Sequence, residues 1–130
     1  MNKDATHSYI RGLDHLQLAM PAGEEAAARA FYGDLLGLAE LEKPPELAAR
    51  GGVWFALGTQ ALHLGVETPF TPARKAHPAL GVRDLEACET RLQAAGVDTL
   101  PDTALPHVRR FYAADPFGNR LEFIQVGDKF

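Results

Sequence analysis

Four residues of the types that bind metal ions or move protons recur in a regular pattern along this chain. His15 and His77 each lie in a short apolar segment that precedes a stretch with helical spacing. Farther on, His63 and Glu122 lie in two further apolar segments, and His63 follows His15 at nearly the same separation at which Glu122 follows His77. The chain therefore consists of two similar halves, each with two candidate ligands.

Period-two alternation predicts which way these residues face if their segments are strands. In each of the four segments, the ligand-type residue lies on the face opposite most of the large apolar residues. His15 lies opposite Leu16 and Leu18, for example, and Glu122 lies opposite Leu121. We expect the apolar faces to pack against covering helices and the four ligand-type residues to share one concave surface.

Two neutral imidazoles and one carboxylate form a ligand set that leaves positions open on a divalent metal for water or substrate oxygens. We therefore expect His15, His77 and Glu122 to surround one metal ion: zinc, nickel, manganese or iron(II). His63 is a further candidate, because an imidazole either ligates a metal or acts as a general base near neutral pH. Both of its roles stay open at this point.

Two helices are expected to hold these segments in place. The first runs from about Gly23 to Leu36 and should end at Gly37, a residue type that commonly terminates helices. The second should begin after an N-cap at Asp84 and end at Gly96. Because both helices precede an aromatic segment and then a last apolar segment, the two halves share one order of elements.

That order is βαβββ in each half, and it predicts an α+β fold within a single domain over residues 1–130. The first module covers about residues 10–67 and the second about residues 76–127. A linker at about residues 68–75 contains two prolines that break regular structure.

Several motifs resemble the vicinal-oxygen-chelate superfamily, which includes glyoxalases, bleomycin-resistance proteins and extradiol dioxygenases. These motifs, in order, are Asp14-His15-Leu16-Gln17-Leu18, Phe31-Tyr32-Gly33-Asp34-Leu35-Leu36-Gly37-Leu38, His77-Pro78-Ala79-Leu80 and Asp115-Pro116-Phe117-Gly118-Asn119-Arg120-Leu121-Glu122. The resemblance implies two βαβββ modules whose eight strands form an open, curved, barrel-like sheet with a metal on its concave face. In that superfamily the metal chelates two neighbouring substrate oxygens and stabilises the negative charge that develops on them.

His63 departs from one branch of this superfamily. The lactoylglutathione lyases that resemble this chain carry a glutamate at its position, where it serves as fourth ligand and catalytic base. The histidine weakens the expectation of lyase activity. The remaining set of His15, His77 and Glu122 resembles that of the extradiol dioxygenases and of the fosfomycin-resistance thiol transferases.

Substrate contacts are expected from side chains near the ends of the predicted strands. The candidates are Arg50, Arg110, Trp54 and Tyr112. Two arginines that converge on an open metal site would suit an anionic substrate, because guanidinium binds carboxylate or phosphate through two parallel hydrogen bonds.

Composition limits the partners of the chain. Its formal net charge is -4 and its basic residues are scattered among acids, so nothing indicates nucleic-acid binding. No apolar run approaches the length of a membrane span, and the single cysteine cannot form an internal disulfide. We expect a cytoplasmic protein that binds a small molecule and forms a homodimer, since pairing of two chains would cover exposed sheet edges.

Two functions remain open on the sequence alone. The first is a metal-dependent enzyme of the lyase, isomerase, thiol transferase or dioxygenase type. The second is a metal-free protein that sequesters a drug-like compound, as bleomycin-resistance proteins do. A sequestering protein has no need of histidines and a glutamate at matching strand positions, which favours the enzyme.

Overall fold

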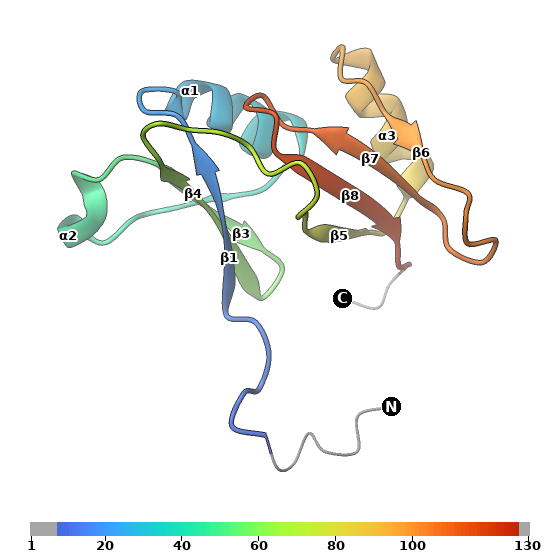
Figure 1. Cartoon of the computed structure of the whole chain (residues 1–130), viewed down its shortest axis with the longest axis horizontal. Coiled ribbons are helices and arrows are strands. Elements are labelled where there is room, and N and C mark those ends of the chain that lie inside the picture. Colours follow the sequence, from blue (N-terminus) through green and yellow to red (C-terminus); the bar gives the residue numbers. More distant parts are fainter. Residues whose placement is uncertain (1–7, 128–130) are drawn as a thin grey trace.

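Two four-stranded sheets lie side by side, and helices α1 and α3 lie on the same side of the molecule (Figure 1). The structure is a computed structural model, and it describes residues 8–127. The predicted α+β class is confirmed. The eight strands divide equally between two separate open sheets, and neither sheet closes on itself.

The first sheet is built by residues 15–66 in the order β1-β4-β3-β2, with β1 parallel to β4 and the other pairs antiparallel. Its strands are β1 (His15–Met20), β2 (Glu40–Leu41), β3 (Val53–Leu57) and β4 (Gln60–Val66). Its helices are α1 (Glu25–Ala28), the π-helix η2 (Arg29–Leu35) and the short α2 (Pro45–Ala48).

The single helix predicted in the first half is thus an α-helical turn that continues as a π-helix. The amide of Leu36 bonds to the carbonyl of Phe31 at 2.9 Å, five residues back, which is the π-helical pattern. The helical segment ends before Gly37, as predicted, and this glycine has a φ of 80°.

The second sheet repeats this topology with residues 79–125, in the order β5-β8-β7-β6. Its elements are β5 (Ala79–Val82), α3 (Leu85–Ala94), β6 (Leu100–Pro101), β7 (Arg110–Ala114) and β8 (Arg120–Gln125). The predicted N-cap of α3 is confirmed, because Asp84 accepts a hydrogen bond from the Ala87 amide at 3.0 Å. No helix within residues 8–127 is both long and apolar enough to cross a membrane.

The prediction that His77 lies on a strand is wrong, because His77 precedes strand β5 by two residues. Strand β5 begins only at Ala79, and Pro78 before it has no amide hydrogen to continue the ladder. The carbonyl of Pro78 still accepts a hydrogen bond from the Glu122 amide at 3.0 Å. His77 is therefore held beside β8 by the segment that leads into β5.

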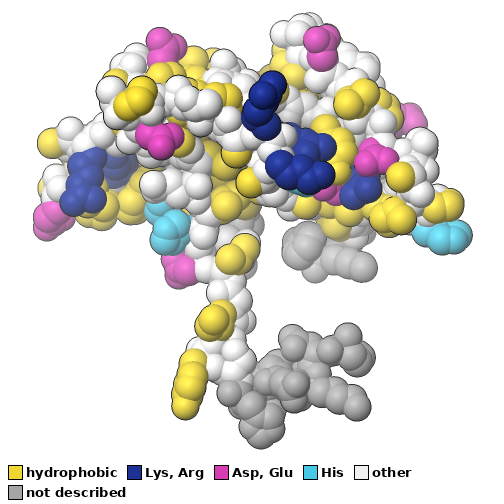
Figure 2. All heavy atoms as spheres, in the orientation of Figure 1, with side chains coloured by type: hydrophobic (Ala, Val, Ile, Leu, Met, Phe, Trp, Pro, Cys, Tyr) yellow, Lys and Arg dark blue, Asp and Glu magenta, His cyan; other side chains and the backbone are white. Residues whose placement is uncertain are grey.

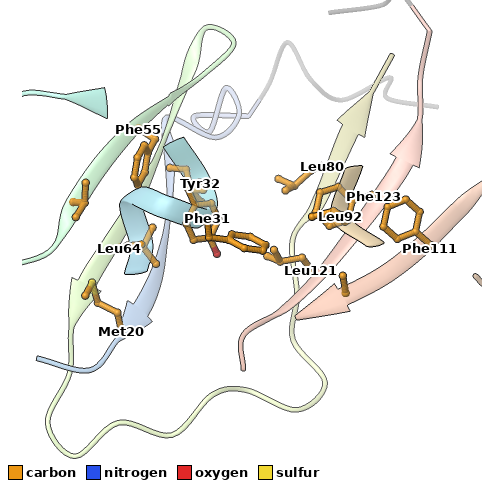
Figure 3. Close-up of a cluster of buried hydrophobic side chains, with 14 of the residues drawn as sticks. Met20, Phe31, Tyr32, Phe55, Leu64, Leu80, Leu92, Phe111, Leu121 and Phe123 are labelled. Atoms are coloured by element: carbon orange, nitrogen blue, oxygen red, sulfur yellow. The ribbon is translucent and has the colours of Figure 1, made fainter. Parts of the chain in front are cut away.

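Buried side chains from both modules form one core (Figure 3). In the first module, Phe55 and Leu64 of the sheet pack with the π-helix. In the second, Phe111 and Phe123 stack with ring centroids 5.0 Å apart. Phe31 points from the first module toward the second, so the hydrophobic core is continuous between them (Figure 3).

A buried polar network also ties the modules together. The Tyr32 hydroxyl donates to Asp115 Oδ2 at 2.7 Å, and the Asn119 side-chain amide donates to the same oxygen at 2.9 Å and to the Ala19 carbonyl at 2.8 Å. Burial and the charge of Asp115 raise the pKa of Tyr32 far above its ordinary value, so the hydroxyl remains a donor. The motif from Asp115 to Asn119 therefore joins the two modules.

Candidate metal centre

The four candidate ligands form two pairs, one in each module. His15 and His63 belong to the first sheet, whereas His77 and Glu122 belong to the second. Within residues 8–127, no three histidine, cysteine, aspartate or glutamate side chains lie close enough together to hold a metal ion. One chain alone thus does not bring His15 together with His77 and Glu122.

The first pair is part of an aromatic stack. The rings of His15 and His63 lie 4.4 Å apart at an interplanar angle of 19°, and Trp54 covers the other face of His63 at 3.9 Å and 2°. We call His15, His63 and Trp54 the histidine stack. His63 is only 7% exposed, and its pKa is lowered by burial and by the nearby charges of His15 and Lys43. It is therefore held in the neutral form near pH 7.

His15 is oriented by the residue before it. Its Nδ1 lies 2.9 Å from Asp14 Oδ1, and a carboxylate can only accept, so Nδ1 carries the hydrogen. In neutral His15 the lone pair is then on Nε2, the usual arrangement when a carboxylate supports a metal-binding histidine. About half of the His15 side chain is exposed, which leaves it open to a ligand.

The second pair shows a close approach of two acceptors. His77 Nδ1 lies 2.9 Å from the Lys75 carbonyl, and a carbonyl accepts only, so Nδ1 is again the donor. Neutral His77 would therefore have a bare lone pair on Nε2. That atom lies 2.9 Å from Oε1 of the buried Glu122 carboxylate.

Such an arrangement requires a cation shared between the two atoms, either a proton or a metal ion. The side chains fit a divalent metal in their donor chemistry, since one offers an imidazole nitrogen and the other a carboxylate oxygen. His77 also donates its other ring hydrogen to a backbone carbonyl, as metal-binding histidines usually do.

Arg110, a predicted substrate contact, reaches this pair, but its charge is already balanced. Its guanidinium donates to Asp102 Oδ2 at 3.1 Å and to Glu122 Oε2 at 3.4 Å. Its buried Nε has no hydrogen-bond partner within the described residues. The arginine thus holds Glu122 in place, and two carboxylates compete with any substrate anion for it.

The other predicted contacts are divided in the same way. Trp54 lies in the histidine stack, and the Tyr112 ring meets His77 edge-on at 5.2 Å. Arg50 is exposed, and its side chain makes no hydrogen bond, ion pair or ring contact with residues 8–127. Nothing in the structure connects Arg50 with either pair.

Three residues near the pairs were not identified from the sequence. Asp14 was quoted within a motif, and its position next to His15 was a usable signal for its orienting role. Lys43 lies in an irregular segment, and Arg120 stacks over Tyr112 with 4.3 Å between its guanidinium carbon and the ring centroid. No periodic pattern marks either of these cations.

Comparison with known proteins agrees with this architecture. A crystal structure assigned to the glyoxalase family from Bacillus anthracis is 49% identical, with a TM-score of 0.88 over 91% of this chain and 97% of that one. Lactoylglutathione lyase from Agrobacterium tumefaciens is 23% identical, with a TM-score of 0.67 over 91% and 96% of the two chains. TnmS3, an antibiotic-binding protein from Streptomyces sp. CB03234, is 24% identical, with a TM-score of 0.70 over 92% and 98%.

The last two similarities lie below 25% identity and bear on the fold alone. Among curated protein sequences, no relative of this chain is found. The family model described as Glyoxalase/Bleomycin resistance protein/Dioxygenase superfamily matches residues 12–123, which is nearly the whole chain. Together with the repeated βαβββ topology, this match shows that the chain belongs to the glyoxalase/bleomycin resistance protein/dioxygenase superfamily.

Proposed function

We propose that the protein is a metal-dependent enzyme that acts on a small oxygenated molecule, and that two chains assemble its metal centre. His15 of one chain would hold the metal together with His77 and Glu122 of the partner subunit. The observation that carries this proposal is the 2.9 Å approach of His77 Nε2 to Glu122 Oε1, which brings together two atoms of the kinds that bind divalent metals.

Exposed surface next to the histidine stack supports assembly from two chains. Residues 8–13 form an extended arm that points away from the sheets (Figure 1). Tyr9, Ile10 and Leu13 on this arm are 102%, 80% and 73% exposed. Strands β1 and β5 are also edge strands of their sheets. A second copy of the chain would cover apolar and edge surface that is costly to leave in water.

A bound divalent metal supplies Lewis-acid stabilisation of negative charge on substrate oxygens. The residues of the chain supply the rest. Asp14 fixes the tautomer of His15, and Arg110 fixes the carboxylate of Glu122. Because the rings of His15 and His63 are nearly parallel, their in-plane lone pairs do not converge on one point. This geometry suits His63 as a neutral base beside the metal better than as a fourth ligand.

Subunit complementation tests the shared centre. Two inactive variants, His15→Ala and Glu122→Ala, are given different tags, mixed under exchange conditions and purified as the heterodimer. If each centre uses His15 of one chain and Glu122 of the other, one centre per heterodimer has both ligands intact. We expect about one tightly bound zinc or nickel ion per heterodimer and almost none in either homodimer.

A centre built within single chains predicts the opposite, because every chain in the heterodimer then carries one defect and no metal binding returns. Equal metal content in the parent and both homodimeric variants would contradict the metal centre itself and favour a metal-free sequestering protein. A heterodimer of the parent chain with Glu122→Ala serves as the control, and it should retain one centre under either arrangement.

A further inference from the structure

A groove of about 930 Å³ lies at the outer edge of β7, beside the second ligand pair. The linker and the segment that follows α3 form its other walls. Its lining includes Pro72, Arg74, Val97, Leu100, Tyr112 and Arg120. Strand β6 pairs only with Tyr112 and Phe111, so it does not cover the rest of the β7 edge.

The positive charges in this groove are less balanced than those at Arg110. Arg120 donates to the Lys75 carbonyl at 3.4 Å and has no carboxylate partner within residues 8–127. Arg74 has no hydrogen bond or ion pair to any described residue. Of the two acids in the lining, Asp115 is bound by Tyr32 and Asn119, which leaves the exposed Asp98. Lys and Arg side chains also gather near the middle of the molecular face in Figure 2.

Tyr112 connects the groove to the ligand pair. The Arg120 guanidinium lies over its ring, while the ring meets His77 edge-on with centroids 5.2 Å apart. His77 in turn contacts Glu122. A molecule in the groove would therefore meet the Arg120 guanidinium and the Tyr112 ring side by side, next to the ligand pair.

We propose that this groove binds a small organic anion with a flat apolar body. Its carboxylate or phosphate group pairs with Arg120 and Arg74, since guanidinium binds such groups by charge-assisted hydrogen bonds. The apolar body packs on Tyr112, Val97 and Leu100. In relation to the proposed function, the groove anchors an anionic substrate through Arg120 and Arg74, the role that the sequence suggested for Arg50 and Arg110. Binding of the anion itself does not require metal.

The test uses 2-naphthoate and its neutral analogue 2-naphthamide as probes of the intact 130-residue chain after chelator treatment. Titration calorimetry gives the affinity, and amide chemical shifts locate the bound probe. We expect naphthoate to bind at least about tenfold more tightly than naphthamide, with the largest shifts at the groove. Arg120→Gln and Arg74→Gln should each weaken naphthoate binding about tenfold and leave naphthamide unchanged.

Arg109→Gln is the matched control. Arg109 is exposed, immediately precedes β7 and lies outside the groove lining, and its substitution changes the net charge by the same amount. It should leave the naphthoate affinity within about twofold of the parent's. Equal binding of the two probes, or parent-like naphthoate affinity in both groove variants, would overturn the proposal. Loss of binding in His77→Ala with no loss in the groove variants would also overturn it, since the anion would then occupy the ligand pair.

A partner chain in the groove is the remaining alternative. In that case naphthoate would compete with self-association, so its apparent affinity would fall as the protein concentration rises. That result would contradict a free anion site. Zinc content of the same variants, measured before chelator treatment, separates this proposal from the metal centre. Arg120→Gln should keep the metal, whereas Glu122→Ala should lose it and still bind naphthoate.

Discussion

The Tyr32 hydroxyl donates its 2.7 Å hydrogen bond from the π-helix of the first module to Asp115 in the turn between β7 and β8 of the second. Both residues are almost completely buried. The same carboxylate accepts from the Asn119 side chain, which also reaches the end of β1 through the Ala19 carbonyl. Because β1 carries His15 and β8 carries Glu122, this network fixes the relative position of the two halves of the candidate site.

Replacing Tyr32 with phenylalanine removes this donor and leaves a buried carboxylate with one partner fewer. We expect Tyr32→Phe to lower the free energy of unfolding by roughly 1–3 kcal/mol. Urea denaturation followed by circular dichroism measures the loss. Tyr9→Phe is the matched control, because Tyr9 is fully exposed and the same atom is removed. Equal stability of the two variants would show that the network does not hold the modules.

Asp14 is expected to act on metal binding through His15. Asp14→Asn leaves the backbone unchanged but replaces the carboxylate that accepts the Nδ1 hydrogen at 2.9 Å. We predict a loss of zinc affinity of about 10–100-fold, the size typical of such supporting contacts. Competition against a coloured chelator measures it. Asp34→Asn, at an exposed position away from both pairs, should leave the affinity unchanged.

The buried His63 predicts how stability depends on pH. Its pKa is held below the ordinary value of 6.5, first by burial and then by the charge of His15. The unfolded chain therefore takes up this proton more readily than the folded chain does. The stability that His63 contributes is present above pH 6.5 and is lost as the pH falls through the lowered pKa.

We accordingly expect the metal-free protein to lose stability between pH 7 and pH 5. Urea midpoints over this range, compared with those of His63→Phe, isolate the contribution. Phenylalanine keeps an aromatic ring between His15 and Trp54 but cannot be protonated. The stability of the His63→Phe protein should therefore depend less on pH than that of the parent. Identical pH profiles for the two proteins would mean that the imidazole is not held neutral by its surroundings.

The sequence was most informative where a residue's environment depends on its immediate neighbours. Alternation along β1, β4 and β8 correctly assigned residues such as Leu62, Leu64 and Leu121 to the core face, because side chains on a strand face opposite sides. The cap at Asp84 followed from local chemistry in the same way. The strands β2 and β6 were not located, since two residues are too short to show any period.

Grouping the ligands was harder, because it depends on contacts between distant segments. Similar spacing of His15 and His77 identified equivalent positions in the two modules. It did not specify whether the modules of one chain face each other, and here the two pairs lie apart. Nor could residue type alone distinguish the balanced Arg110 from the unbalanced Arg120, since that difference arises from Asp102 and Glu122 beside the former.

Gly52 immediately precedes β3, the strand that carries Trp54 of the histidine stack, and its backbone packs closely against β4. Its φ is 88°, and a Cβ at this position would lie 2.2 Å from the backbone carbonyl oxygen of Leu64. Its amide also donates to Glu25 Oε2 at 2.8 Å, at the start of α1. The atoms nearest to this added Cβ all belong to the backbone of β4, so no flexible side chain can move away from the methyl group.

We therefore expect Gly52→Ala to destabilise the protein by roughly 3 kcal/mol or more, the sum of left-handed strain and a backbone clash. Gly58→Ala is the control, because Gly58 also has a positive φ, of 58°, but open space where the Cβ would lie. It should cost only about 1 kcal/mol. Thermal and urea unfolding of the two variants measure the difference. If both lose the same stability, strain alone sets the cost and the close approach to Leu64 is absent in solution.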